Sequence, residues 1–261
     1  MSTPPTATST VLVTRPAADA AVWAEQLRAQ GLAAQALPLI DIAPVLAPSD
    51  LRACWQQLTE YAALVFVSGN AVDHFFAGAG LAWPEAVRCL APGPGTGRKL
   101  RACGVPASCI DEPAPDAPQF DSESLWQVIG QRPWEGLRVL VVRGRSQGEQ
   151  ASSGRDWLTQ KLEQAQAQVD AIAVYERRAP QWSEAQLGAM ARACGDGSLW
   201  LLSSSQALAH LPAGLDLSRA RALATHPRIA QAARKAGFLQ VFESRPTLPE
   251  VIASIKSALH D

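Results

Sequence analysis

Val11-Leu12-Val13-Thr14-Arg15-Pro16 returns in the second half of the chain as Val139-Leu140-Val141-Val142-Arg143-Gly144. Two further repeats follow in the same order: residues 66–72 match 202–208, and residues 90–104 match 223–237. Each repeat is a short apolar run, then a polar or glycine-rich turn, then helix-forming residues, which is the pattern of a strand that leads into a helix. The chain is therefore predicted to be an internally duplicated α/β protein with two similar lobes and a small-molecule site in a cleft between them.

The composition limits the kinds of partner that we expect. The 261 residues are 48% hydrophobic, with a net charge of −1 and a pI near 6.4. This balance gives no basic footprint for a nucleic acid or an anionic membrane, and no apolar run is long enough to span a bilayer. The first ten residues lack the basic and apolar regions of a signal peptide. We expect a cytoplasmic monomer that acts on a small molecule.

Cysteine and histidine spacing argues against a metal site. The five cysteines contain no CxxC pair, which is the pattern of reduced thiols in the cytoplasm. The four histidines are scattered and none has metal-ligand spacing with a cysteine. Residues 93–99 are rich in glycine but match neither a P-loop nor the GxGxxG fingerprint, so a nucleotide cofactor is not expected. No Gly-x-Ser-x-Gly elbow occurs around Ser203–Ser205.

Strands and helices alternate along the chain at the spacing of parallel sheets. Proline-bearing connections near 41–48 and 177–181 are the most prominent breaks in this pattern. If both link domains, residues 1–42 and 177–261 form one discontinuous lobe and residues 43–176 form the other. We expect strands at 11–13, 36–40, 64–67, 88–91, 108–110, 139–142, 171–175, 198–202, 221–224 and 239–242, a long polar loop over 143–154, and a helix after the turn at 203–205.

Polar residues follow most of these strands, at the edge where open parallel sheets bind ligands. Most of the turns open a helix, whose free N–H groups and small hydroxyls bind anions without many charges. Such a lining suits a ligand rich in carboxylates or phosphates, although Ser, Thr and Asn at these turns also serve as ordinary helix caps. We expect several turns, rather than one cation, to share the binding. The candidate binding residues are Arg15, Ser68, Asn70, Gly95, Thr96, Arg143, Ser203, Ser204, Ser205 and Thr225.

Tyr175 ends the predicted strand at 171–175 and is one of only two tyrosines in the chain. Two interpretations of this position stay open. The ring caps the edge of a sheet, or the phenol faces the binding site and donates a proton there.

The order of these segments resembles that of the uroporphyrinogen-III synthase family, from about Val11 to about Leu259. The resemblance implies two flavodoxin-like parallel-sheet lobes joined by a two-stranded linker. It implies a lyase of tetrapyrrole (heme) biosynthesis that uses no metal or organic cofactor. Its substrate is hydroxymethylbilane, which is cyclised to uroporphyrinogen III with inversion of the terminal pyrrole ring and loss of water. The segments that carry the resemblance are Val13–Pro16, Phe66–Val72, Gly93–Thr96 with Leu100, Val139–Gly144, Val174–Arg177 and Ser203–Ala207.

The resemblance also implies roles for single residues. Tyr175 stands where the family has the tyrosine that assists loss of the substrate hydroxyl, before an azafulvene and a spiro intermediate. The acetate and propionate on every pyrrole agree with the anion-binding turns. The chain departs from the usual pattern at 224–226, at Gly97 and in an apparent insertion at 145–153. His226 precedes Pro227 and is expected to start a helix rather than to bind substrate.

Two rival functions stay open on the sequence. A two-lobed binding protein would hold a small polyanionic ligand without catalysis, and turnover of hydroxymethylbilane separates it from an enzyme. A nucleotide-dependent enzyme would reveal itself by thermal stabilisation with nucleotides.

Overall fold

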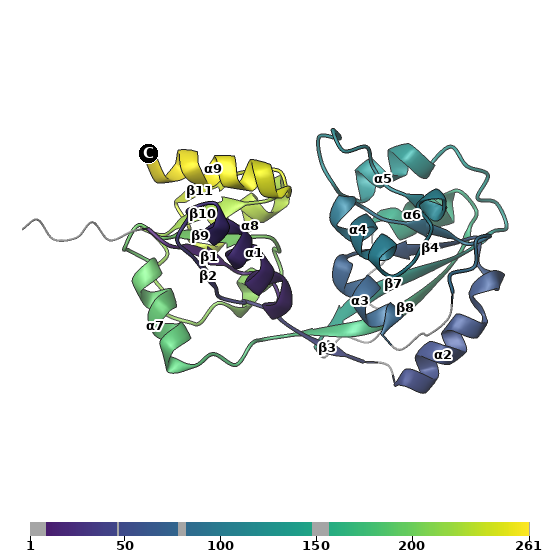
Figure 1. Ribbon diagram of the computed structural model, residues 1–261, viewed down its shortest axis with the longest axis horizontal. Coiled ribbons are helices and arrows are strands. Elements are labelled where there is room, and N and C mark those ends of the chain that lie inside the picture. The colour runs from purple at the N-terminus through teal and green to yellow at the C-terminus, as the bar shows by residue number, and fades with distance from the viewer. Residues whose placement is uncertain (1–8, 46, 78–81, 148–156, 261) are drawn as a thin grey trace, which may run out of the picture. The chain divides into compact units, whose positions relative to one another are not determined.

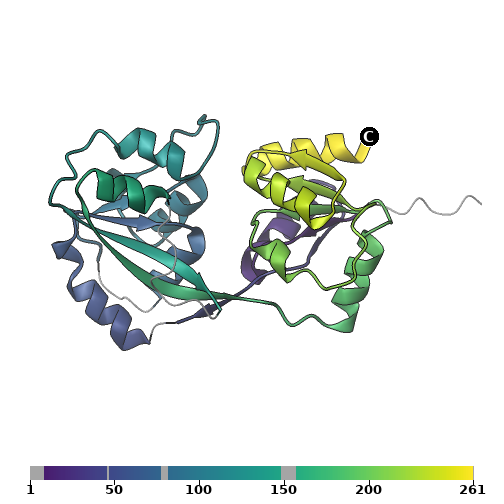
Figure 2. The same cartoon turned by 180° about the vertical axis from the view of Figure 1, so that it is seen from behind.

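The structure, a computed structural model, describes residues 9–45, 47–77, 82–147 and 157–260. Its contacts divide the chain into two compact units (Figure 1). Unit 1 comprises Met1–Asp41 and Ala179–Asp261, and unit 2 comprises Ile42–Arg178. Each unit contains one sheet with helices on both faces, as Figures 1 and 2 show from opposite sides. Among the described residues, no helix combines the length and the apolarity needed to cross a membrane.

The sheet of unit 1 has the strand order β2-β1-β9-β10-β11, and neighbouring strands run parallel. This is the order of a flavodoxin-like sheet. One face packs on α1 and α9, with Val13, Leu201 and Ile255 in the shared core. On the other face Trp200 packs against Phe238 and donates a hydrogen bond to the end of α7. The elements are β1 (Val11–Val13), α1 (Ala17–Ala29), β2 (Ala34–Ala36), α7 (Glu184–Ala193), β9 (Leu199–Leu202), η3 (Ala207–His210), β10 (Arg221–Ala224), α8 (Pro227–Ala236), β11 (Gln240–Glu243) and α9 (Leu248–His260).

The sheet of unit 2 has the order β3-β8-β7-β4-β5-β6. Helices α2, α3 and α4 cover the face that carries Phe66, against which Phe75 of α3 packs. Helices α5 and α6 cover the face that carries Val65, and Leu125 of α5 packs there. The elements are β3 (Asp41–Pro44), α2 (Pro48–Gln56), η1 (Leu58–Glu60), β4 (Ala63–Phe66), α3 (Gly69–Phe76), β5 (Arg88–Leu90), α4 (Pro94–Ala102), η2 (Ala107–Cys109), β6 (Ile110–Asp111), α5 (Ser122–Ile129), β7 (Arg138–Ser146), α6 (Trp157–Gln164) and β8 (Gln168–Arg178).

The repeats in the sequence occupy equivalent places in the two sheets. The matched segments form β1 and β7, β9 and β4, and β10 and β5. In both sheets these strands stand side by side in the same spatial order, so that β2-β1-β9-β10-β11 corresponds to β8-β7-β4-β5-β6. The predicted α/β class and internal duplication are confirmed. The chain crosses from unit 1 to unit 2 at the start of β3 and returns to unit 1 after the end of β8. These two strands are neighbours in the sheet of unit 2.

Two expected strand boundaries were wrong, because strand pairing decides them. The strand expected at 36–40 is β2, at Ala34–Ala36. The ladder stops before Pro38, which has no N–H to donate, although Leu37 and Leu39 still donate to the backbone of β1 and Thr14. The loop expected from Arg143 begins later, because β7 continues to Ser146 and stays paired with β8, which spans Gln168–Arg178 rather than 171–175, across a register shift at Arg143/Gly144. The expected insertion at 145–153 lies partly outside the described residues.

Two shorter segments also differ from the expectation. The turn at 203–205 leads into η3, a single 3₁₀ turn, rather than into an α-helix. The weak strand expected at 108–110 is η2 followed by the two-residue β6.

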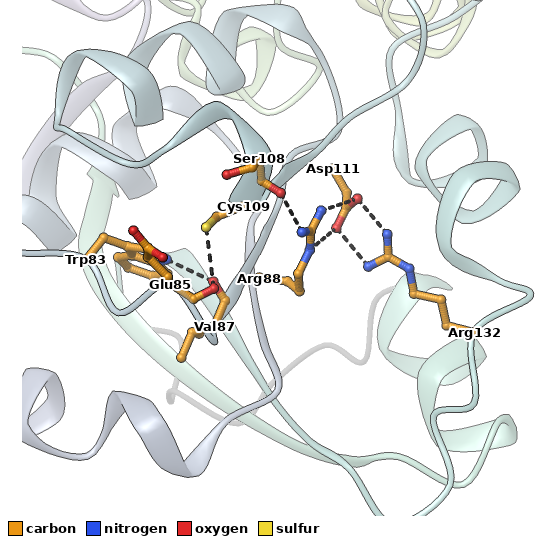
Figure 3. Close-up of polar contacts among 8 residues, drawn as sticks. All are labelled: Trp83, Glu85, Val87, Arg88, Ser108, Cys109, Asp111 and Arg132. Carbon is orange, nitrogen blue, oxygen red and sulfur yellow. Dashed lines mark hydrogen bonds and ion pairs between the residues drawn. The ribbon is translucent and has the colours of Figure 1, made fainter.

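Asp111 fastens the edge of the sheet in unit 2 (Figure 3). Its carboxylate, in a residue that is 8% exposed, accepts two hydrogen bonds from Arg88 and two from Arg132, at 2.5–2.9 Å. These contacts join β5, β6 and the segment that follows α5. Burial by itself raises the pKa of Asp111, but the hydrogen bonds from Arg132 and Arg88 outweigh it and lower the pKa.

Replacing Asp111 with Asn is expected to lower the free energy of unfolding by up to about 3 kcal/mol at pH 7, because it leaves two arginines without a counter-charge. A lowered pKa in the folded state stabilises the protein above about pH 4, and this contribution is lost as the pH falls through the folded value. Urea unfolding at pH 7 and pH 3 measures the effect. Glu60→Gln, which removes an exposed partner of Arg138, is the control and should cost under about 1 kcal/mol. Equal losses for Asp111→Asn at both pH values would contradict this account.

Candidate functional site

Ligands of open α/β sheets bind beyond the carboxyl ends of the strands, where the strand order reverses. In unit 1 this switch point lies between β1 and β9, which precede Arg15 and Ser203. In unit 2 it lies between β7 and β4, the strand that precedes Ser68.

A β-bulge turns Tyr175 towards the helix α3. Arg143 lies opposite Ala173 and Gly144 lies opposite Tyr175, so that Val174 is an extra residue in β8. Without the bulge, strand alternation would place Val174 and Tyr175 on opposite faces. Both side chains instead join the core cluster that contains Phe66 and Phe75. The bulge therefore brings the only tyrosine of β8 to the face where α3 begins.

Tyr175 is 2% exposed, and its phenol interacts with Ser68, Arg177 and His74. Its hydroxyl shares a hydrogen bond of 3.2 Å with the hydroxyl of Ser68, and it accepts one of 3.3 Å from Nη2 of Arg177. The ring stacks on His74, with centroids 5.7 Å apart and an interplanar angle of 29°. Burial lowers the pKa of His74, Asp73 opposes this shift and Lys99 adds to it, so that the imidazole is neutral near pH 7.

Gly144 makes room for this arrangement. Strand β7 lies between β8 and β4, so Tyr175 must reach across β7 to touch Ser68. A Cβ at position 144 would lie 2.7 Å from Cδ2 of Tyr175 and closer still to Cε2 and Cζ. Carbon atoms in contact are about 3.5–4.0 Å apart. Only glycine at this position lets the ring cross the strand.

Strand alternation places Arg143 on the other face of β7 from the Tyr175 cluster. Alternation along β7 places it on the face of Val139 and Val141, away from the face of Leu140 and Val142 that leads to Gly144. On the face of the sheet that carries Arg143, Glu176 forms ion pairs with Arg178 at 2.7 Å and with Arg145 at 3.2 Å. Hydrogen bonds from Arg178 are the main cause that lowers the pKa of Glu176, with Arg145 adding to them.

The other candidate residues of unit 2 lie at the beginnings of α3 and α4. Ser68 is the N-cap of α3, and its oxygen accepts a hydrogen bond from the N–H of Ala71 at 3.3 Å. Asn70 lies in the first turn of α3, and exposed Gly95 and buried Thr96 lie in the first turn of α4. Lys99 of α4 packs over Gly69 and forms an ion pair with Asp73, so a cation stands close to Ser68.

In unit 1 the structure places a poorly satisfied cation at the switch point. Arg15 follows β1 and stacks 4.1 Å above the ring of Trp23, and its buried Nε has no hydrogen-bond partner among the residues that the structure describes. Within the described residues its guanidinium forms no ion pair. Burial lowers the pKa of Arg15 to about 10, although Asp19 acts in the opposite direction. A cation that is partly desolvated and unpaired is well suited to an incoming carboxylate.

The hydroxyl residues of unit 1 divide into two groups. Thr225 is buried, and its hydroxyl donates to the carbonyl of Leu202 at 3.4 Å. Ser203, Ser204 and Ser205 follow β9, and within the described part of the chain their hydroxyls make no hydrogen bond; Ser205 is exposed and the other two are half-buried. His226 is the N-cap of α8, where its Nδ1 accepts the N–H of Arg228 at 3.1 Å, which confirms the expected helix-start role.

The sequence analysis quoted Gly144 and Arg177 within its motifs but gave no site role to either residue, nor to His74 or Lys99. Arg177 could have been found, because it lies two residues after Tyr175 and strand alternation puts both on one face. Gly144 could not have been found, because it lies opposite Tyr175 only as a result of the bulge in β8. Among the described residues, no group of three or more His, Cys, Asp or Glu side chains could hold a metal ion.

Comparison with known proteins identifies the family. The family described as uroporphyrinogen-III synthase HemD matches residues 21–253. The chain belongs to the uroporphyrinogen-III synthase family. A uroporphyrinogen-III synthase from Synechococcus elongatus is 30% identical over 184 residues, which is 69% of this chain and 65% of the relative. A uroporphyrinogen-III synthase from Chlorobaculum parvum is 33% identical over 143 residues, which is 52% of this chain and 53% of the relative. The matched region thus covers less than two thirds of either relative's length.

Solved structures of the family share the fold. Uroporphyrinogen III synthase from Thermus thermophilus, in a mutant form, aligns over 97% of this chain and 99% of its own, with a TM-score of 0.59 and 15% identity. The uroporphyrinogen-III synthetase of Helicobacter pylori aligns over 97% and 99%, with a TM-score of 0.54 and 16% identity. At this identity the likeness concerns the fold, and it agrees with the flavodoxin-like strand order of both sheets of this chain.

Proposed function

We propose that this chain is a cytoplasmic, monomeric uroporphyrinogen-III synthase, a lyase that closes hydroxymethylbilane to uroporphyrinogen III with inversion of the terminal ring. Membership of the family supports the reaction. The observation that carries it is the phenol of Tyr175, which a bulge and a glycine hold at the switch point of unit 2, within hydrogen-bond distance of Ser68 and Arg177.

The chemistry begins with loss of the substrate hydroxyl. The C–O bond breaks, the oxygen leaves with both bonding electrons, and a proton from Tyr175 turns it into water. The pyrrole nitrogen supplies the electrons, so that the bilane becomes an azafulvenium cation and Tyr175 becomes a phenolate. Loss of the pyrrole N–H proton to the phenolate then gives the neutral azafulvene. The substrate hydroxyl takes the place of the Ser68 oxygen as the hydrogen-bond partner of the phenol. Ser68 is half-buried whereas Tyr175 is buried, so the substrate reaches the phenol from the side of Ser68.

Inversion requires positioning rather than further acid–base groups. The terminal ring must be held so that attack occurs at its substituted carbon and forms the spiro intermediate. We assign that holding to contacts with the acetate and propionate groups. In unit 2 these contacts come from Ser68, Asn70, Gly95 and Thr96 at the beginnings of α3 and α4, and we assign Arg143 on the opposite face a weaker share. In unit 1 they come from Arg15, Ser203, Ser204, Ser205 and Thr225.

Arg15→Met should raise KM for hydroxymethylbilane about tenfold or more, because a hydrogen-bonded charge pair is worth about 1.5–3 kcal/mol. The same change should raise the free energy of unfolding, because it removes a partly buried cation that forms no ion pair within the described residues, while keeping a side chain on Trp23. Steady-state kinetics and urea unfolding measure the two effects.

Thr225→Ala is the comparison for Arg15→Met, since its hydroxyl already bonds to the backbone of β9. We expect only a modest increase in KM, as backbone N–H groups share the load. A variant Arg15→Met that is less stable than the wild type and binds substrate normally would make Arg15 a structural residue.

Turnover distinguishes the enzyme from a binding protein. Purified chain should consume hydroxymethylbilane catalytically, at sub-stoichiometric protein concentration. Thermal stabilisation by the bilane without any acceleration of its consumption would favour the two-lobed binding protein instead.

A further inference from the structure

Arg177 and Arg178 differ in the groups that their guanidinium charges contact. Arg178 and Arg145 both pair with the carboxylate of Glu176. Arg177 forms no ion pair within the described part of the chain, and its guanidinium lies beside Tyr175, with Cζ 5.2 Å from the ring centroid. Strand alternation explains the difference, because residues 175 and 177 face one side of β8 and residues 176 and 178 face the other.

The hydrogen bond between Arg177 and Tyr175 fixes the direction of the phenol proton. A guanidinium can only donate, so the phenolic oxygen accepts from Nη2 of Arg177 at 3.3 Å. The proton of the phenol is then free to point to the other side, where Ser68 lies 3.2 Å away. The charge of Arg177 also faces the atom that becomes negative when Tyr175 gives up its proton.

We propose that Arg177 is a positioning residue for Tyr175: it orients the phenol proton towards the departing substrate oxygen and stabilises the phenolate that is left. This inference rests on the proposed function, since it assigns Arg177 a part in the same step. Its charge acts through Tyr175 rather than through a carboxylate of the substrate. Arg177 is therefore expected to influence the rate of the chemical step and not the affinity for the bilane.

The test compares Arg177→Met with Arg178→Met, which removes the same charge one residue further on and on the opposite face. Arg177→Met should lower kcat about tenfold with KM unchanged, and Arg177→Lys should restore part of the loss. Arg178→Met should keep the wild-type kcat. In a Tyr175→Phe background, Arg177→Met should change kcat by less than about twofold, because the oxygen on which it acts is gone.

Fluorine NMR provides a readout that does not depend on turnover. With only two tyrosines in the chain, 3-fluorotyrosine labelling gives two signals, which Tyr61→Phe assigns. Arg177→Met should move the Tyr175 signal, and Arg178→Met should leave it in place.

Two results would overturn the inference. One is a folded Arg177→Met variant with the wild-type kcat. The other is a loss that appears in KM and persists in the Tyr175→Phe background, which would make Arg177 a carboxylate-binding residue. Absence of turnover by the unmodified chain would overturn the proposed function itself, and is thereby distinguished from these results.

Discussion

Gly144→Ala is expected to lower kcat about 100-fold, because the added Cβ would lie 2.7 Å or less from the ring of Tyr175. Contact distances of about 3.5–4.0 Å require the ring to move by about 1 Å or more, and the phenolic oxygen then leaves its place beside Ser68 and Arg177. Displacement of this size costs about 10²-fold when it misaligns a reacting group. Overpacking should also lower the free energy of unfolding by about 1–3 kcal/mol. Steady-state kinetics and urea unfolding measure both quantities.

Gly195→Ala is the control, because a Cβ at that position meets no atom within 4 Å and the backbone is not left-handed. It should keep both the rate and the stability of the wild type. In a Tyr175→Phe background, Gly144→Ala should reduce kcat little further, since the oxygen that it displaces is already missing. A full, additive loss in that background would show that Gly144 acts on something other than Tyr175.

Tyr175→Phe is expected to keep the fold and the affinity for substrate but to lower kcat at least about tenfold. General-acid assistance is typically worth about 10²–10⁴ in rate, and electron release by the pyrrole supplies part of the driving force here. The ring stays packed against His74 and Gly144, so that the stability should fall by only about 1 kcal/mol for the lost hydrogen bonds. Single-turnover kinetics under saturating substrate isolates the chemical step. Wild-type kcat in the folded variant would return Tyr175 to a structural role at the edge of the sheet.

Much of the fold could be predicted because each repeat in the sequence combines an apolar run with a turn and a helix. The strands that begin at Val11, Leu199 and Arg221 lie within a residue of their expected places, since these buried runs have little choice of structure. The ends of β7 and β8 could not be predicted. Arginine and serine have no strong preference for a strand and glycine disfavours one, and they are extended here because β7 and β8 stay paired beyond the bulge.

The sequence points to the turns of the candidate site but not to the side-chain contacts within it. The turns after the strands point to Ser68, Arg15 and the serines at 203–205 from the sequence alone. The hydrogen bond between Tyr175 and Ser68 depends on one extra residue in β8 and on the lack of a side chain at Gly144 in β7. Neither feature leaves a periodic signal, because a bulge is set by strand register, and register is a property of the folded sheet.

The central claim is that this chain inverts the terminal ring while it closes the macrocycle. The most direct test incubates hydroxymethylbilane with the purified protein, oxidises the products and separates the type I and type III isomers. Our account predicts that the wild-type chain forms the type III isomer at a rate that grows with protein concentration. Tyr175→Phe should lower that rate at least about tenfold. Formation of the type I isomer alone, at the rate seen without protein, would contradict it.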